Sequence, residues 1–202
     1  MILPVVKYGH PMLRQRGKRI EAVTPEIREL ADSMLETMRA SAGVGLAAQQ
    51  VGHLVLLMVL DVRESERPST MQVNGTEADI AAHMPMVLLN PVLTEPAGKE
   101  VGFEGCLSFP AISADICRAE SITVSAMDLD GQPLNFRCGG LLARVIQHEN
   151  DHLHGVLFVD RMDSATKVSL GGVLKRLQKE TQADLPPARK RGARSLPASR
   201  HA

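Results

Sequence analysis

The sequence predicts an α+β domain in which small antiparallel sheets pack around one central helix, followed by a C-terminal helix and a flexible tail. Short strand-like segments fill the middle of the chain, whereas the helix with the densest polar motif, at 141–154, comes late. Strands gathered before a late helix, rather than alternating with helices, are typical of this class. The alternating segment 121–128 is joined to 134–137 by Asp130-Gly131, a turn pair that indicates an antiparallel hairpin.

The N-terminal part is predicted to hold one amphipathic helix and one strand. The helix is expected over 25–39, because Thr24 can cap it, Pro25 suits its first position, and apolar residues recur at helical spacing. The glycine-bearing stretch 43–50 then turns the chain toward a strand near 54–62.

The middle segment 63–85 is polar and is interpreted as a long loop. Two short strands are expected next, at 86–89 and 92–94, separated by Asn90-Pro91. After the hairpin, Gly155 is expected to end the late helix.

The C-terminal part is predicted to contain a strand, a helix and a tail. The apolar run 156–159 is interpreted as a further strand, and 165–182 as a third helix. The Pro- and Arg-rich segment 183–202 lacks apolar periodicity and is expected to be a flexible tail.

The composition is that of one ordinary globular domain. The chain has 202 residues, of which 44% are hydrophobic and 23% are charged, enough for a well-buried core. Lys and Arg number 23, as do Asp and Glu, so the overall charge favours no DNA partner. The longest apolar run, 54–60, is too short to span a bilayer, so no membrane partner is expected. Three widely spaced cysteines and no export signal predict a cytoplasmic protein.

The late helix contains an HExxH motif, the strongest chemical feature of the sequence. His148 and His152 lie four residues apart, so they share one helical face and can bind one metal ion, with Glu149 beside them to handle protons. A solvated polar face is the alternative interpretation, and a metal site needs a third ligand.

Three sources of that ligand are open from the motif alone. In HExxHxxGxxH proteases a third histidine would fall at Phe158, which argues against that class. Glu180 on the downstream helix is a second candidate, and Cys106 in the upstream stretch EGCLS is the third.

Three stretches together resemble the signature motifs of the peptide deformylase family. They are GVGLAAQQ at 43–50, EGCLS at 104–108 and QHENDH at 147–152, in the same order and with similar spacing. Flanking stretches are also similar, and the resemblance covers about residues 5–163. It implies a deformylase catalytic domain over 1–164, with the helix 165–182 and the tail 183–202 outside it.

The resemblance implies roles for the residues that match these motifs. It implies that Cys106, His148 and His152 bind one divalent metal ion, leaving an open position for water. Glu149 would accept and return the proton of that water. Gln50 and the backbone N–H of Leu107 would stabilise the oxyanion.

The family also implies where the substrate binds. The substrate is an N-formylmethionyl nascent peptide, whose formamide C–N bond is hydrolysed. At Gly45 and Gly105 the missing side chain would let the peptide backbone come close. Val44, Leu141 and Val145 match the positions that hold the methionine side chain, although packing alone would also explain them.

The sequence departs from the commonest bacterial pattern in the same region. Arg144 replaces a residue that is often aliphatic, and Ser113 lies near a position that is often arginine. Arg144 is interpreted either as part of a retuned pocket rim or as a surface residue. Cys117 and Cys138 have no ligand neighbours and are expected to be buried apolar residues.

The resemblance bears on the choice of metal, while the HExxH motif and the basic tail leave other functions and partners open. The family often uses Fe²⁺, while Zn²⁺, Ni²⁺ and Co²⁺ suit the same ligands. A metallopeptidase of another HExxH class is the alternative enzyme, and an inactive binding module is a further one. The basic tail and the helix 165–182 suggest attachment to ribosomes, and a solvated tail that only aids solubility is the alternative.

Overall fold

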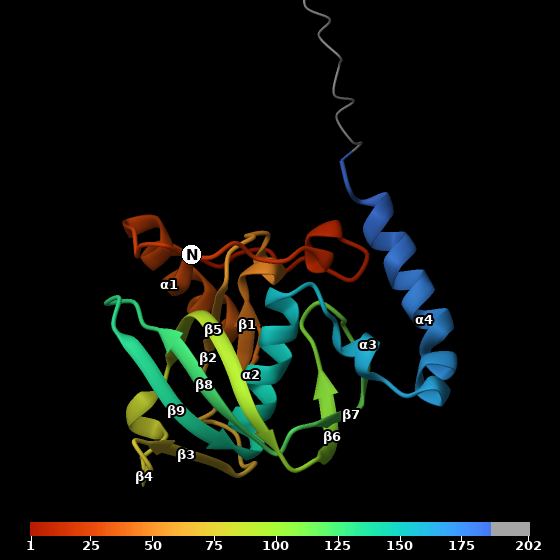
Figure 1. Ribbon diagram of the computed structural model, residues 1–202. Coiled ribbons are helices and arrows are strands. Elements are labelled where there is room, and N and C mark those ends of the chain that lie inside the picture. Colours follow the sequence, from red (N-terminus) through yellow and green to blue (C-terminus); the bar gives the residue numbers. More distant parts are fainter. Residues whose placement is uncertain (187–202) are drawn as a thin grey trace, which may run out of the picture.

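The computed structural model describes residues 1–186, so the tail expected over 183–202 lies outside the described residues from 187 onward. Two antiparallel sheets flank the helix α2 (Gly140–Leu153) (Figure 1). The large sheet has the order β1-β2-β5-β8-β9-β3-β4. Its strands are β1 (Gly45–Ala47), β2 (Leu57–Leu60), β5 (Met86–Ala97), β8 (Ser121–Met127), β9 (Pro133–Gly139), β3 (Ser69–Val73) and β4 (Thr76–Glu77). The second sheet is the hairpin of β6 (Glu100–Gly105) and β7 (Ser113–Arg118). The predicted α+β class is confirmed.

The helix α1 (Pro25–Ala40) forms where the sequence predicts it. Pro25 occupies its first turn, and Thr24 is the N-cap residue, although its side chain makes no capping hydrogen bond. Met34 and Met38 on its apolar face are fully buried and pack against Leu57 and Leu89 of the large sheet. Burial of that face, rather than a strong cap, is therefore what holds α1 in place.

The predicted hairpin is also present, as β8 and β9, and is longer than expected. It pairs Ser121 with Gly139 at one end and Met127 with Pro133 at the other. Gly131 in the turn has φ +77°, a backbone conformation that favours glycine. Ile122 and Val124 face the core under α2, where they meet Leu142 and Ile146.

The prediction of a loop over 63–85 is wrong, because this segment contains two strands and a short helix. β3 and β4 form a hairpin whose turn is Asn74-Gly75, both with positive φ. β3 adds to the edge of the sheet by pairing with β9, and a short 3-10 helix, η3 (Ala81–His83), follows. The Asn-Gly pair was a usable turn signal, but the polar flanking residues hid the strands.

The two strands expected at 86–89 and 92–94 are one strand, β5. Asn90 adopts φ +52°, and the pairing with β8 shifts register between Leu89 and Val92. The Asn90 side chain accepts a hydrogen bond from Ile20 N at 2.9 Å and donates one to Ile20 O at 2.8 Å. The Asn-Pro pair therefore marks an irregularity within the strand, not its end.

The prediction of a strand at 156–159 is wrong, because this segment leads into the short helix α3 (Phe158–Arg161). Asp160 Oδ2 accepts a hydrogen bond from Leu157 N at 2.8 Å, which favours the helical turn. Leu157 and Phe158 are buried, and the Phe158 ring meets the Phe109 ring at 4.9 Å between centroids. A short apolar run cannot distinguish a buried strand from a buried helix by periodicity.

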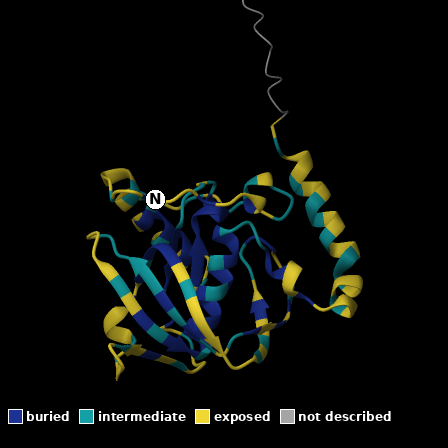
Figure 2. Cartoon of the chain, viewed as in Figure 1, coloured by how far each residue is buried: buried dark blue, intermediate teal, exposed yellow. Residues whose placement is uncertain are grey.

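The helix predicted at 165–182 is found as α4 (Ser164–Ala183), at the edge of the molecule (Figures 1 and 2). None of its residues is buried; Leu170, Leu174 and Leu177 pack at half-burial against the core cluster around Phe109 and Phe158. The opposite side of α4 faces solvent. Among residues 1–186, no helix combines the length and apolar character needed to cross a bilayer.

Candidate active site

The start of α2 is held by the segment that leads into β3. Leu141 N donates to Pro68 O at 2.9 Å, and Leu142 N donates to Ser69 Oγ at 3.1 Å. Gly140 adopts φ +64°, and a Cβ there would lie 2.3 Å from Pro68 O. These contacts satisfy N–H groups that a helix start leaves free, and they fix where α2 begins.

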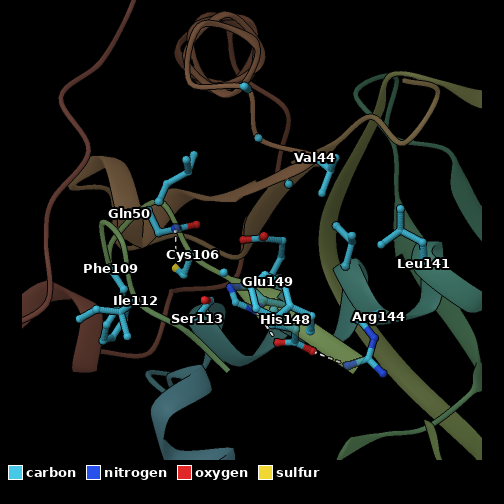
Figure 3. A pocket seen from close by; sticks show the side chains of 18 of the residues that line it. Val44, Gln50, Cys106, Phe109, Ile112, Ser113, Leu141, Arg144, His148 and Glu149 are labelled. Carbon is cyan, nitrogen blue, oxygen red and sulfur yellow. Dashed lines mark hydrogen bonds and ion pairs between the residues drawn. The ribbon is translucent and has the colours of Figure 1, made fainter. Parts of the chain in front are cut away.

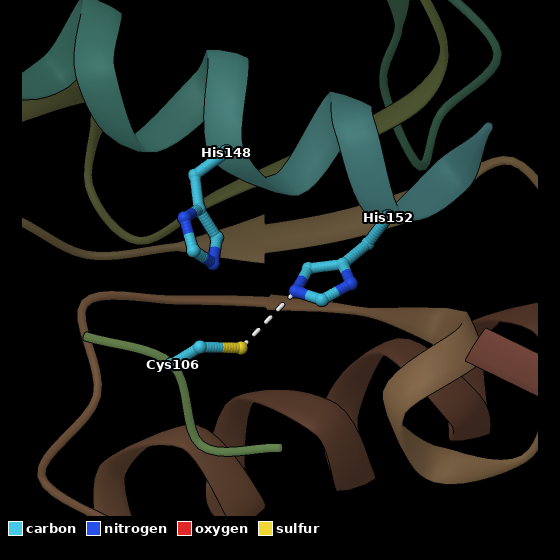
Figure 4. A group of neighbouring side chains, drawn as sticks. All are labelled: Cys106, His148 and His152. Atoms are coloured by element: carbon cyan, nitrogen blue, oxygen red, sulfur yellow. Dashed lines mark hydrogen bonds between the residues drawn. The ribbon is translucent and has the colours of Figure 1, made fainter. Parts of the chain in front are cut away.

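Cys106, His148 and His152 come together on the inner side of α2 (Figure 4). Cys106 directly follows β6, while both histidines project from α2. Its sulfur lies 3.2 Å from His152 Nε2, and one ligand atom from each of the three residues lies within 4.8 Å of the others. A thiolate and two imidazoles so arranged can hold one transition-metal ion.

Glu104 links His148 of the candidate metal group to Arg118. Its Oε2 lies 2.9 Å from His148 Nδ1, and both carboxylate oxygens accept hydrogen bonds from Arg118, at 2.8 and 2.9 Å. Burial alone would raise the pKa of Glu104, but Arg118 and His148 lower it to about 2. The ionised carboxylate occupies Nδ1 of His148, so Nε2 is the nitrogen left for an ion.

The two histidines differ in their protonation tendencies. Burial and the neighbouring positive charges of His148 and Arg118 lower the pKa of His152. For His148 burial also acts to lower the pKa, but the nearby Cys106 sulfur and the Glu104 carboxylate outweigh it and raise the pKa. His152 is therefore ready as a neutral ligand, whereas His148 must lose a proton to become one.

Glu149 is a buried carboxylate beside the candidate ligands. It is buried, Oε2 has no hydrogen-bond partner among the described residues, and burial raises its pKa to about 7. A Cβ on Gly45 would lie 2.6 Å from Glu149 Oε1, so β1 passes directly over the carboxylate. A carboxylate with a pKa near neutrality can both take and return a proton.

Gln50 approaches Cys106 from the opposite wall. Its Oε1 accepts a hydrogen bond from Ala47 N at 2.8 Å, which turns Nε2 toward Cys106 Sγ at 3.5 Å and Ser108 Oγ at 3.4 Å. Gln50 belongs to the short 3-10 helix η2 (Ala48–Val51) and is only 1% exposed. The amide donor is therefore fixed next to the candidate metal group.

A cavity of about 640 Å³ opens in front of these groups (Figure 3). Its lining includes Val44, Gly45 and Leu107, together with Leu141 and Val145 of α2. Gly105 also lines it, and nothing lies within 4 Å of where its Cβ would stand. All residues singled out as substrate-binding thus meet at one cavity that reaches the candidate metal group.

The other two sources of a third ligand are not at this place. Phe158 is buried in the core next to Phe109, and Glu180 lies exposed on α4. The ligand atoms of Cys106 and the two histidines come together without either of them. The histidine at 154 is half-buried and its Nδ1 contacts Asn150 O at 2.8 Å.

Two expectations about side chains near the site need correction. Arg144 is 2% exposed and bonded to Glu104, so its interpretation as a surface residue is wrong; it lines the cavity, as does Ser113. Cys138 is buried as expected, and burial raises its pKa to about 12. Cys117, however, is exposed, because it lies on the outer face of β7.

The ion pairs next to the candidate metal group were not predicted from the sequence. Glu104 opens the EGCLS stretch and could have been found there, since metal-binding histidines usually have a carboxylate partner. Arg118 and Asp151, joined at 2.6 Å, carry no comparable signal. Arg118 lies at the end of a strand that the sequence did not indicate.

An α+β fold with a cysteine, two helical histidines and a buried glutamate at one cavity defines the class of metal-dependent hydrolases. The family model described as polypeptide deformylase matches residues 2–168. The chain belongs to the polypeptide deformylase family. It is therefore a hydrolase that removes the N-formyl group from newly made proteins, in a family that depends on a metal ion.

Curated relatives match nearly the whole chain. The peptide deformylase of Opitutus terrae is 44% identical over 185 residues, covering 91% of this chain and 96% of that one. The peptide deformylase of Methylacidiphilum infernorum is 41% identical over 179 residues, covering 89% and 94%.

Solved structures of the family share the fold. Arabidopsis thaliana peptide deformylase 1B, in complex with an inhibitor, gives a TM-score of 0.78 at 34% identity and covers 95% of this chain and 100% of its own. The peptide deformylase of Thermus thermophilus gives a TM-score of 0.74 at 36% identity, covering 89% and 99%.

Proposed function

We propose that Cys106, His148 and His152 hold one divalent metal ion, and that Glu149, Gln50 and Leu107 act on the formamide bond of N-formylmethionyl peptides. The observation that carries this proposal is the 3.2 Å approach of Cys106 Sγ to His152 Nε2 beside a buried carboxylate whose pKa is about 7. A comparison of formyl-Met-Ala with acetyl-Met-Ala tests it, because only the formylated dipeptide should release a free amine.

The donor set suits a transition metal. One thiolate and two imidazoles favour Fe²⁺, Zn²⁺, Ni²⁺ or Co²⁺ over Mg²⁺ or Ca²⁺, and we propose Fe²⁺ as the ion used by this chain. Glu104 presets His148 for binding, as the partners of metal-bound histidines usually do. The ion, when bound, would supply the Lewis acidity that makes water nucleophilic near neutral pH. Metal analysis of protein purified without oxygen tests the choice of ion.

Glu149 is proposed to move the protons of the reaction. Its partnerless Oε2 would accept the proton of the attacking water and then deliver it to the departing methionine amine. Gln50 Nε2 and the backbone N–H of Leu107 would donate hydrogen bonds to the negative charge that develops on the formyl oxygen. Because Gln50 is held by Ala47 N, this donor needs no reorganisation when the charge forms.

The cavity is proposed to hold the methionine side chain. Leu141 and Val145 are 7% and 6% exposed and form an apolar wall, while Val44 at 36% forms the rim. The open space at Gly105 and the strand β1 at Gly45 would let the peptide backbone lie alongside as an added strand.

A metallopeptidase of another HExxH class is the alternative function. It would need a ligand downstream of α2, but Phe158 is buried and Glu180 is exposed on α4. Cleavage of an internal peptide bond in an unformylated peptide at a rate similar to deformylation would favour this alternative.

We also propose that α4 and the following segment bring the enzyme to ribosomes in the cytoplasm. The exposed surface of α4 carries Lys167, Lys175, Arg176 and Lys179, and the basic segment 189–200 lies outside the described residues. The three cysteines are unpaired, in keeping with a reducing compartment. Truncation after Gln182 should leave activity on formyl-Met-Ala unchanged and weaken co-sedimentation with ribosomes at low salt. Equal co-sedimentation of both forms would contradict a role for the segment.

A further inference from the structure

Arg144 is a buried cation between the histidine-bearing helix and the hairpin that leads to Cys106. It is 2% exposed and lies one turn before His148, on the same side of α2 (Figure 3). Neither the candidate metal ligands nor the proposed proton transfer uses it. A buried charge is costly unless it is paired, so the partners of Arg144 show which parts of the chain it holds together.

The partners of Arg144 come from both strands of the β6–β7 hairpin. Nη1 donates to Gly102 O at 3.3 Å, Glu104 Oε1 at 2.8 Å and Ile116 O at 2.9 Å. Nη2 donates to Glu100 O at 2.8 Å and Glu100 Oε2 at 3.4 Å. One guanidinium on α2 thus binds the main chain of β6 twice and that of β7 once.

Gly102 provides the room for this arrangement. A Cβ at that position would lie 3.0 Å from Arg144 Cζ and Nη2, and 3.2 Å from Nε. The φ of Gly102 is not positive, so the backbone conformation itself does not require glycine. A glycine at 102 therefore leaves the space that the Arg144 guanidinium occupies against β6.

Arg144 completes a row of three polar contacts between α2 and the hairpin. Arg144 meets both strands, His148 meets Glu104, and Asp151 meets Arg118 at 2.6 Å. Positions 144, 148 and 151 lie on one helical face because they are four and three residues apart. The hairpin forms a sheet separate from the large one, and these side-chain contacts join it to α2, in addition to the packing of Ala114 and Ile116 in the core around Phe109.

We propose that Arg144 is a positioning residue that fixes the β6–β7 hairpin on α2 and thereby sets the distance from Cys106 to the two histidines. Cys106 directly follows the last residue of β6, so a shift of that strand along α2 moves the sulfur. An aliphatic side chain at 144 could not bind three main-chain carbonyls. This inference rests on the proposed metal site and adds to it the residue that holds its two halves together.

The test compares metal binding by Arg144→Leu, Gly102→Ala, the double variant and the full-length parent, using cobalt(II) as the probe without oxygen. Removing a residue that supports the metal ligands typically lowers metal affinity by about 10–100-fold. We expect a loss of this size for Arg144→Leu. The sulfur-to-cobalt absorption band should also change, which a general loss of stability would not cause. Gly102→Ala should weaken binding in the parent but add little in the Arg144→Leu background.

Two further variants keep the test decisive. Arg28→Leu is the matched control: it also removes an ion-paired arginine from a helix, α1, but its partner Asp130 lies in the β8–β9 turn, so the cobalt affinity and spectrum should stay unchanged. Arg144→Lys keeps the charge but cannot reach both strands, so it should bind cobalt more weakly than the parent even if Arg144→Leu fails to fold. Parent-like affinity and spectrum in Arg144→Lys, or a lower melting temperature of Arg144→Leu with unchanged cobalt binding, would overturn the proposal.

Failure of the metal site itself would be visible separately. If the parent gave no sulfur-to-cobalt band, or if Cys106→Ser left that band intact, then the ligand assignment would be wrong. The Arg144 comparison is interpreted only against a parent that shows the band and a Cys106→Ser variant that loses it.

Discussion

Oε2 of Glu104 lies 2.9 Å from Nδ1 of His148, while Arg118 binds both oxygens of the same carboxylate. The pair links a strand that ends next to Cys106 with the helix that carries both histidines. Since Glu104 is 6% exposed, its ionised form depends on these partners and not on water. The geometry of the site and the stability of the fold therefore share one carboxylate.

The first prediction concerns the pH dependence of stability through Glu104. Its pKa in the folded protein is lowered from an ordinary 4.5 to about 2, so its ionisation stabilises the fold above pH 4.5, and this contribution is lost as pH falls toward 2. The size is on the order of 3 kcal/mol at neutral pH. Urea unfolding of metal-free parent and Glu104→Gln should show a difference in unfolding free energy that shrinks as pH falls through this range. A difference that does not vary with pH would contradict the prediction.

The second prediction concerns Glu149. Glu149→Ala removes the only group proposed to transfer protons, so kcat should fall by at least about 10²-fold. Metal content should remain that of the parent, because Glu149 is not among the three residues that bring ligand atoms together. Turnover is measured on metal-loaded protein with formyl-Met-Ala; near-parent turnover would remove Glu149 from the mechanism.

Gln50 is the subject of the third prediction. Gln50→Ala deletes one donor to the developing oxyanion and should lower kcat by about 10²–10³-fold. The metal content should change little, since Gln50 contacts Cys106 only through its amide. Loss of metal from this variant would instead point to a structural role for the 3.5 Å contact with the sulfur.

The fourth prediction separates the two glycines of the cavity. A Cβ at Gly45 would lie 2.6 Å from Glu149 Oε1 and 2.7 Å from Val145 Cγ1, so Gly45→Ala should destabilise the fold by about 1–3 kcal/mol and lower kcat. At Gly105 a Cβ meets nothing within 4 Å, so Gly105→Ala should keep the stability of the parent and raise KM by obstructing the peptide. Thermal unfolding and steady-state kinetics distinguish the two. Equal losses of stability would contradict the assignment.

The elements that the sequence determined by itself are those whose signals are local. The helix α1 follows from a 3.6-residue apolar period, and the β8–β9 hairpin from alternation around Asp130-Gly131. The HExxH spacing places His148 and His152 on one helical face whatever the rest of the chain does. Family motifs then extended these local signals to the cavity residues, which the structure brings to one place.

Other features were decided only by tertiary structure, because their signals are not local. β6 alternates glutamate and glycine with exposed Val101 and Phe103, and it becomes a strand through pairing with β7. The run at 156–159 bends into a helix because its apolar side chains fill a core around Phe109. An arginine is expected at the surface by composition alone, yet Arg144 is buried, since a glycine on one strand and carbonyls from two strands enclose it. Burial of a charge is decided by partners that lie far away in the sequence, and only the folded chain supplies them.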